Sequence, residues 1–180
     1  MKTTAKFLLL LLVFLVIFWL QTAVSFLLPF PFSTINIITV LLAILLLRRH
    51  HWSIVWLAFA LFFFIELYTS SPFGVIIFSG TIGVLLTFWV YSRIFSNHSW
   101  YIAAAITATM LISYRLIYMV AIILLYWLNL APWLLNINIL PALIWELFLS
   151  VVASALISLM LSLLWPDKNK LKAAGPLFKV

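Results

Sequence analysis

The sequence predicts an all-α integral membrane protein, a bundle of about six transmembrane helices with both termini in the cytoplasm. Hydrophobic residues make up 68% of the chain and charged residues 7%, whereas a soluble domain carries roughly 25% charged residues. Several apolar runs approach or exceed the roughly 20 residues that span the hydrocarbon core of a bilayer. The cations gather in every second turn between these runs, and Arg115 is the exception.

The expected helices follow from where prolines, glycines and charges interrupt the apolar runs. Pro29 and Pro31 close the first run, Arg48 ends the second, and Pro72 with Gly74 separates the third from the fourth. The six expected helices are residues 7–28, 33–47, 52–68, 75–92, 100–128 and 139–165.

The first run also has features of a signal peptide, since Lys2 and Lys6 precede it and residues 23–25 loosely fit a cleavage site. It is long enough to span a membrane, and the next apolar run follows at once. We therefore expect an uncleaved first helix.

The charges of the turns predict how the chain threads through the membrane. The segments that carry cations are the N-terminus, 48–51, 93–98 and 167–180. The segments without charge are 29–33, 69–74 and 129–138. The two sets alternate, and cytoplasmic loops are the ones enriched in Lys and Arg. We expect one transmembrane domain over 1–166 and a basic cytoplasmic tail over 167–180, in a multi-pass membrane protein.

Three ionisable side chains, Glu66, Arg115 and Glu146, lie inside apolar runs and form a candidate intramembrane polar site. A charge at bilayer depth costs at least about 2.5–3.5 kcal/mol, so each needs a partner or water. Arg115 and Glu146 lie on consecutive, antiparallel helices and are expected to meet. Two interpretations stay open: an ion pair that fixes helix packing, or a polar site that receives a ligand or a partner's helix.

Small residues recur every four positions in the last two-thirds of the chain. The sixth expected helix carries Ser150, Ser154 and Ser158, and the fourth carries Ser79, Gly83 and Thr87. Small residues at this spacing let helix backbones approach closely within lipid. They indicate either packing within the chain or a docking face for another membrane protein.

The composition argues against several other functions. The chain has no Cys, and its three His are not accompanied by clustered carboxylates, so we expect no metal and no cofactor. No paired-carboxylate, Ser-His or phosphate-loop motif appears, so we expect no enzymatic activity. The net charge of +7 is spread among the turns, which predicts contact with membrane lipid and does not indicate nucleic acid.

Residues 18–99 contain a series of short motifs: a Gln that closes the first helix, an Asn that opens the second, a basic turn, and an acidic residue followed by Pro-Phe-Gly. The residues at these places are Gln21, Asn36, Arg48, Arg49, Glu66, Leu67, Tyr68, Ser71, Pro72, Phe73, Gly74, Arg93, Ile94, Phe95 and Asn97. In this order they resemble the rod shape-determining protein MreD family, which implies a multi-pass protein of the bacterial inner membrane. The chain departs from the family pattern at Glu66, where Asp is usual, at Ile35 in place of Pro, and at Ala58 and Ala60 in place of Gly.

The resemblance implies a non-enzymatic subunit of the cell-elongation machinery, which binds an MreC-like scaffold protein and helps link MreB filaments to peptidoglycan synthesis. Partner contacts are then expected at the outward corner and the small-residue face: Tyr68, Pro72, Phe73, Gly74, Ser150, Ser154 and Ser158. The competing interpretation is a small-molecule transport component, similar to the substrate-binding membrane subunit of an energy-coupling-factor transporter. A hydrophilic cavity that reaches Arg115 would favour it.

Overall fold

The computed structural model describes residues 16–48, 52–69, 71–94, 100–129 and 139–164, and within these ranges it is helical without strands. A first helix covers Val16–Leu27. The elements that follow are η1 (Phe32–Thr34), α2 (Ile37–Arg48), α3 (Ser53–Tyr68), α4 (Val75–Ile94), α5 (Trp100–Trp127) and α6 (Ile139–Leu164).

Three of these helices are long and apolar enough to cross a membrane, which indicates a membrane protein. Their apolar stretches are Val75–Arg93 in α4, Tyr101–Trp127 in α5 and Pro141–Leu164 in α6. The helices over Val16–Leu27, Ile37–Arg48 and Ser53–Tyr68 are shorter apolar helices. The expected first helix begins at residue 7, so part of it lies outside the described residues, as does the tail.

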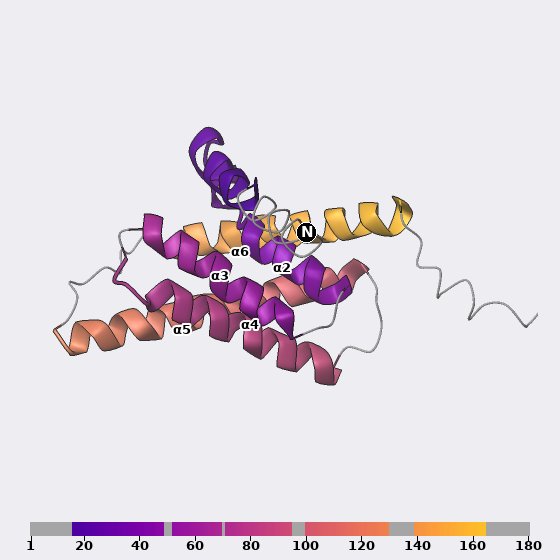
Figure 1. Cartoon of the computed structure of the whole chain (residues 1–180). Coiled ribbons are helices and arrows are strands. Elements are labelled where there is room, and N and C mark those ends of the chain that lie inside the picture. Colours follow the sequence, from indigo (N-terminus) through magenta and orange to yellow (C-terminus); the bar gives the residue numbers. More distant parts are fainter. Residues whose placement is uncertain (1–15, 49–51, 70, 95–99, 130–138, 165–180) are drawn as a thin grey trace, which may run out of the picture.

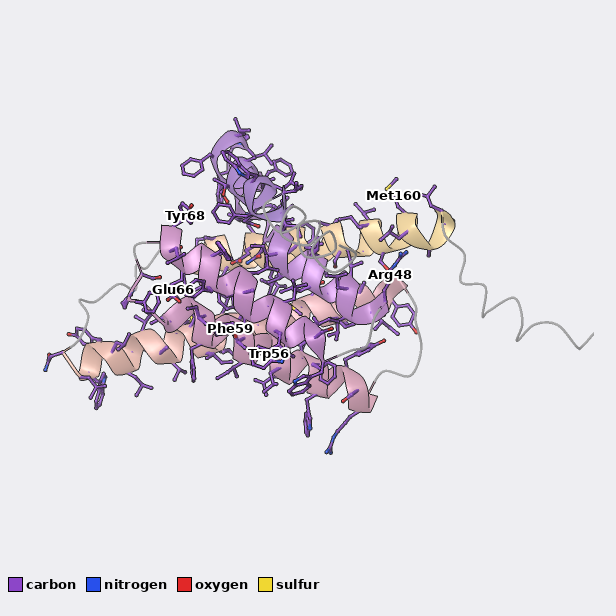
Figure 2. The ribbon with its side chains drawn as sticks, viewed as in Figure 1. Arg48, Trp56, Phe59, Glu66, Tyr68 and Met160 are labelled. Carbon is purple, nitrogen blue, oxygen red and sulfur yellow. The ribbon has the colours of Figure 1, made fainter. Side chains whose placement is uncertain are left out.

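Helices α2 to α6 lie side by side along a common direction, and the first helix is steeply inclined to them (Figure 1). The most extensive packing joins α4 to α5, followed by α5 to α6 and α3 to α4, while α2 packs against α5 and α6. The C-terminal ends of α2, α4 and α6 lie at one end of the bundle (Figure 1). Glu66 and Tyr68 lie at the opposite end from Arg48 (Figure 2). Arg48 in the last turn of α2 and Arg93 in the last turn of α4 therefore lie at the opposite end of the bundle from Glu66 and Tyr68 (Figure 1 and Figure 2).

The second helix differs from the expectation. It was predicted over 33–47, but residues Phe32–Thr34 form a 3₁₀ turn and α2 begins at Ile37. Its 12 residues span about 18 Å, well short of a hydrocarbon core of about 30 Å. The other four complete helices agree with their predicted ranges to within about two residues, the usual uncertainty of a helix end.

Helix α4 packs closely against both neighbours because small residues line its inner side. A Cβ atom added at Gly80 would lie 2.4 Å from the ring of Phe62 in α3. One added at Gly83 would lie 3.1 Å from the backbone nitrogen of Tyr114 in α5. The rings of Phe62 and Tyr114 stack with their centroids 5.6 Å apart. The small residues of α4 thus serve packing within the chain, the first of the two interpretations given above.

Gly80→Val should lower the free energy of unfolding by about 2 kcal/mol, because the added side chain overlaps the buried Phe62 ring. Unfolding in detergent, followed by circular dichroism, measures this. The single variant Phe62→Ala leaves a cavity and should lower the free energy of unfolding by about 3 kcal/mol. The double variant should be much less destabilised than the sum of the two single variants. Additive effects would show that Gly80 and Phe62 are not in contact.

Candidate functional site

The ion pair expected between Arg115 and Glu146 is present. Arg115 Nε donates to Glu146 Oε2 at 2.9 Å, and Arg115 Nη2 donates to the same oxygen. The Glu146 side chain is 7% exposed and that of Arg115 34%. The carboxylate is therefore enclosed by the bundle, whereas part of the guanidinium stays accessible.

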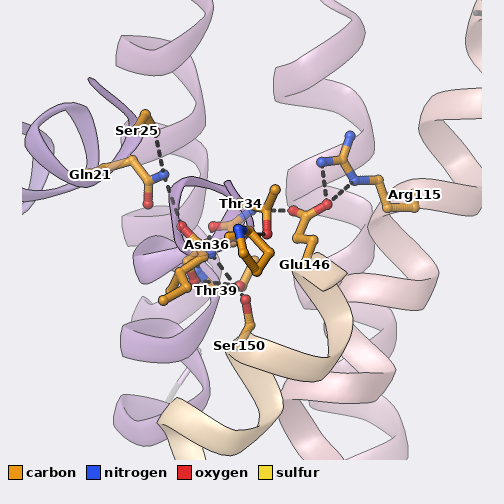
Figure 3. A network of polar contacts seen from close by, with 10 residues as sticks. Gln21, Ser25, Thr34, Asn36, Thr39, Arg115, Glu146 and Ser150 are labelled. Atoms are coloured by element: carbon orange, nitrogen blue, oxygen red, sulfur yellow. Dashed lines mark hydrogen bonds and ion pairs between the residues drawn. The ribbon is translucent and has the colours of Figure 1, made fainter. Parts of the chain in front are cut away.

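Asn36 connects this pair to the start of α2 (Figure 3). Its side-chain Nδ2 donates to Glu146 Oε1 at 3.1 Å, and its backbone N–H donates to the hydroxyl of Ser150 at 3.0 Å. Its Oδ1 accepts the backbone N–H of Thr39 at 3.2 Å, which is the hydrogen bond of a helix N-cap. One side chain thus caps α2 and also docks it on α6.

Gln21 of the first helix completes the arrangement. Its Oε1 accepts the backbone N–H of Ile37 at 2.8 Å, and its Nε2 donates to the carbonyl of Ile35 at 3.3 Å. The first N–H groups of a helix have no partner within the helix. At the start of α2, side chains accept three of these N–H groups: Ser150 accepts that of Asn36, Gln21 that of Ile37 and Asn36 that of Thr39. We call Gln21, Asn36, Arg115, Glu146 and Ser150 the α2-start network.

Two partly open cavities lie on either side of the ion pair. The larger, about 350 Å³, has a lining that is about half polar and consists of Gln21, Ser25, Ser33, Thr34, Asn36, Arg115, Ala142, Leu143 and Glu146. The smaller, about 180 Å³, is largely apolar and is lined by Leu111, Ile112, Arg115, Leu116, Met119, Leu143, Glu146 and Leu147. Arg115, Leu143 and Glu146 form the wall that both cavities share.

Glu66, the third charge of the predicted polar site, is held at a different helix start. Its two carboxylate oxygens accept the backbone N–H groups of Ile76 and Ile77 at 3.1 and 3.2 Å. An anion at this position complements the positive end of the α4 macrodipole. The grouping of Glu66 with Arg115 and Glu146 is therefore corrected: the three charges form two sites, and the partner of Glu66 is backbone.

The predicted partner-contact residues fall into two groups. Tyr68 and Phe73, at the corner between α3 and α4, are 76% and 73% exposed. Ser150, Ser154 and Ser158 are all buried within the chain. Those serines pack inside the bundle, where α6 runs beside α2 and α5. Their burial favours the first interpretation, packing within the chain, and contact with a partner at these serines stays a prediction.

The residues that complete the site were the hardest to find from the sequence. The sequence singles out Gln21 and Asn36 only through the family resemblance. It does not mark Ser33 or Thr34 as site residues. The available signal was Asn36 directly before an apolar run, since Asn is a favoured N-cap residue. Placing Asn36 at the cap would have corrected the start of the second helix as well.

Comparison with known proteins adds no identification: no family model, curated protein or solved structure matches the chain. Within the part of the chain that the structure describes, no three His, Cys, Asp or Glu side chains are grouped as a metal ion would require. His50, His51 and His98 lie outside the described residues.

Arg115→Leu should lower the free energy of unfolding by about 3 kcal/mol, because it leaves the Glu146 carboxylate buried without its cation. Breaking a buried ion pair costs about 3–5 kcal/mol. We expect the low end of that range because the Arg115 side chain is one-third exposed. Adding Glu146→Leu to that variant should recover part of the loss. Thermal unfolding of both variants in the same detergent makes the comparison. If the single variant is no less stable than the double, the ion pair does not stabilise the fold.

Proposed function

We propose that this chain is a non-enzymatic, multi-pass subunit of the bacterial inner membrane that docks other membrane proteins, within the cell-elongation machinery. About six crossings with both termini in the cytoplasm agree with the alternation of charged and uncharged turns. The expected partner is a scaffold protein of the MreC kind, in accord with the resemblance of residues 18–99 to the MreD family.

The observation that carries the proposal is the corner between α3 and α4. Glu66 is only 3% exposed, and its carboxylate ties the end of α3 to the first turn of α4. Gly74 has a φ of 97°, a left-handed conformation that glycine adopts without strain. The backbone hydrogen bonds from Thr69 to Glu66 and from Val75 to Pro72 close the turn from both sides.

This fixed corner presents aromatic side chains outward. Tyr68 packs its ring 4.9 Å from that of Phe18 in the first helix, yet most of its surface remains exposed. Phe73 lies at the tip of the turn. Aromatic residues are prominent among those that dominate binding energy at interfaces, and a prepositioned contact loses little freedom on binding. The corner also gives a physical reason for the acidic residue and the Pro-Phe-Gly that carry the resemblance.

The cavity at Arg115 favours a second function, the substrate-binding membrane subunit of a transporter. Its polar side is lined by hydroxyl and amide groups from the first helix and the segment before α2. A water-soluble substrate bound there would contact Arg115 through its exposed part.

Replacing Tyr68 and Phe73 together by Ala should reduce recovery of the partner at least about tenfold, since a loss of about 1.4 kcal/mol is tenfold in affinity. The tagged chain is purified in mild detergent from membranes of its own source cells, and co-eluting proteins are identified. Trp56→Ala is the control, because Trp56 is a 68% exposed aromatic residue of the same helix α3. Recovery of elongation proteins that the double variant loses and the control keeps supports the proposal. Recovery of an ATPase pair with its coupling subunit contradicts it and supports the transporter function.

A further inference from the structure

The two cavities at the ion pair differ in chemistry and share a wall. The larger cavity presents amides and hydroxyls, including those of Gln21, Ser33 and Asn36. The smaller lies between α5 and α6 and is lined mainly by aliphatic side chains, including Leu111, Leu116 and Met119. A ligand that fits both needs a polar end and an apolar end. A purely water-soluble molecule would use only the larger cavity.

The hydrogen-bonding capacity that remains at the shared wall is that of a donor. A guanidinium has five N–H groups, and the Arg115 bonds to Glu146 involve Nε and Nη2. The Glu146 oxygens already accept three hydrogen bonds, two from Arg115 and one from Asn36. The carboxylate is nearly enclosed and the guanidinium is not. An acceptor-rich, anionic group is the complement of such a surface, and Arg is well suited to phosphate.

We propose that this double cavity binds a phosphate-bearing lipid. The phosphate contacts the exposed part of the Arg115 guanidinium in the larger cavity, beside its amide and hydroxyl groups, and an acyl chain follows the aliphatic groove between α5 and α6. The inference is independent of the docking function, because it uses none of the residues of the α3–α4 corner.

The depth of the cavity agrees with a lipid occupant. Glu146 lies about two turns, or about 10 Å, along α6 from its first residue Ile139. Ile112 and Leu116 of α5, which line the groove, are 48% and 59% exposed, so in a bilayer this side of the groove would meet the acyl chains of lipids. A lipid already resident in the membrane reaches this groove laterally. The polar lining then replaces the water that its phosphate would lose.

The test uses the delipidated full chain in detergent and follows its thermal unfolding midpoint with three added compounds. These are phosphatidylglycerol, diacylglycerol, which has the chains without the phosphate, and glycerol phosphate, which has the phosphate without the chains. Phosphatidylglycerol should raise the midpoint by about 4 °C or more, because it binds only the folded chain. Each of the other two should give less than half of that shift.

Two variants address the two halves of the site. Leu116→Trp fills the apolar groove, and its matched control is Val120→Trp, since Val120 is equally exposed on α5 (55% against 59%) and lines neither cavity. Arg115→Gln with Glu146→Gln removes the cation and keeps a neutral hydrogen-bonded pair. Both Leu116→Trp and the double Gln variant should lose at least half of the phosphatidylglycerol shift, and Val120→Trp should keep it. The Tyr68/Phe73 double Ala variant should keep it too, which separates this inference from the docking function.

Equal shifts with phosphatidylglycerol and diacylglycerol would overturn the proposal, and so would an unchanged shift in both site variants. A shift with glycerol phosphate as large as that with phosphatidylglycerol would assign the cavity to a water-soluble anion instead. If the double Gln variant fails to fold, the comparison of Leu116→Trp with Val120→Trp still decides the outcome.

Discussion

The fold depends on one constraint: the first N–H groups of α2 lie within the helix bundle and must find their acceptors in the protein itself. A buried backbone N–H group without a partner costs about 1–3 kcal/mol. Helix α2 begins level with Glu146 and Ser150, beyond the first two turns of α6. Gln21 and Asn36 supply the missing acceptors, and Asn36 in turn needs Glu146 and Ser150. The start of α2 therefore fixes the first helix, α2 and α6 relative to one another.

A buried glutamate stabilises the start of a helix at two places in this structure, Glu66 at α4 and Glu146 at α2, with different consequences. Glu66 uses both carboxylate oxygens on the backbone of α4, so its charge is fully employed in fixing a corner. Glu146 divides its oxygens between Asn36 and Arg115, and the guanidinium it holds remains partly accessible. One buried carboxylate thus fixes the corner that we propose as a docking surface, and the other holds a cation with unused N–H donors beside an apolar groove. The two proposed binding functions follow from this difference.

Much of the fold was predictable because its determinants are local. Pro72 and Gly74 mark the corner, and the bounds of α3 to α6 follow from such interruptions. The Arg115–Glu146 pair was predictable because two opposite charges at similar depth on adjacent helices need each other. The start of α2 was not, because the capping role of Asn36 depends on Glu146, which is 110 residues away in the chain. The partner of Glu66 was missed because backbone N–H groups leave no mark in a sequence, and the burial of Ser150 depends on which helix α6 packs against.

The most direct measurement of this constraint is the unfolding free energy of Asn36→Asp, alone and together with Glu146→Gln. Asp is as good an N-cap as Asn, so local helix energetics predict no change. A network that joins Asn36 to Glu146 predicts a loss of about 2 kcal/mol or more, because two carboxylates then face each other at hydrogen-bond distance. The added Glu146→Gln restores one anion and one donor and should recover most of that loss. A fully stable Asn36→Asp variant, or one that Glu146→Gln does not rescue, would contradict the account.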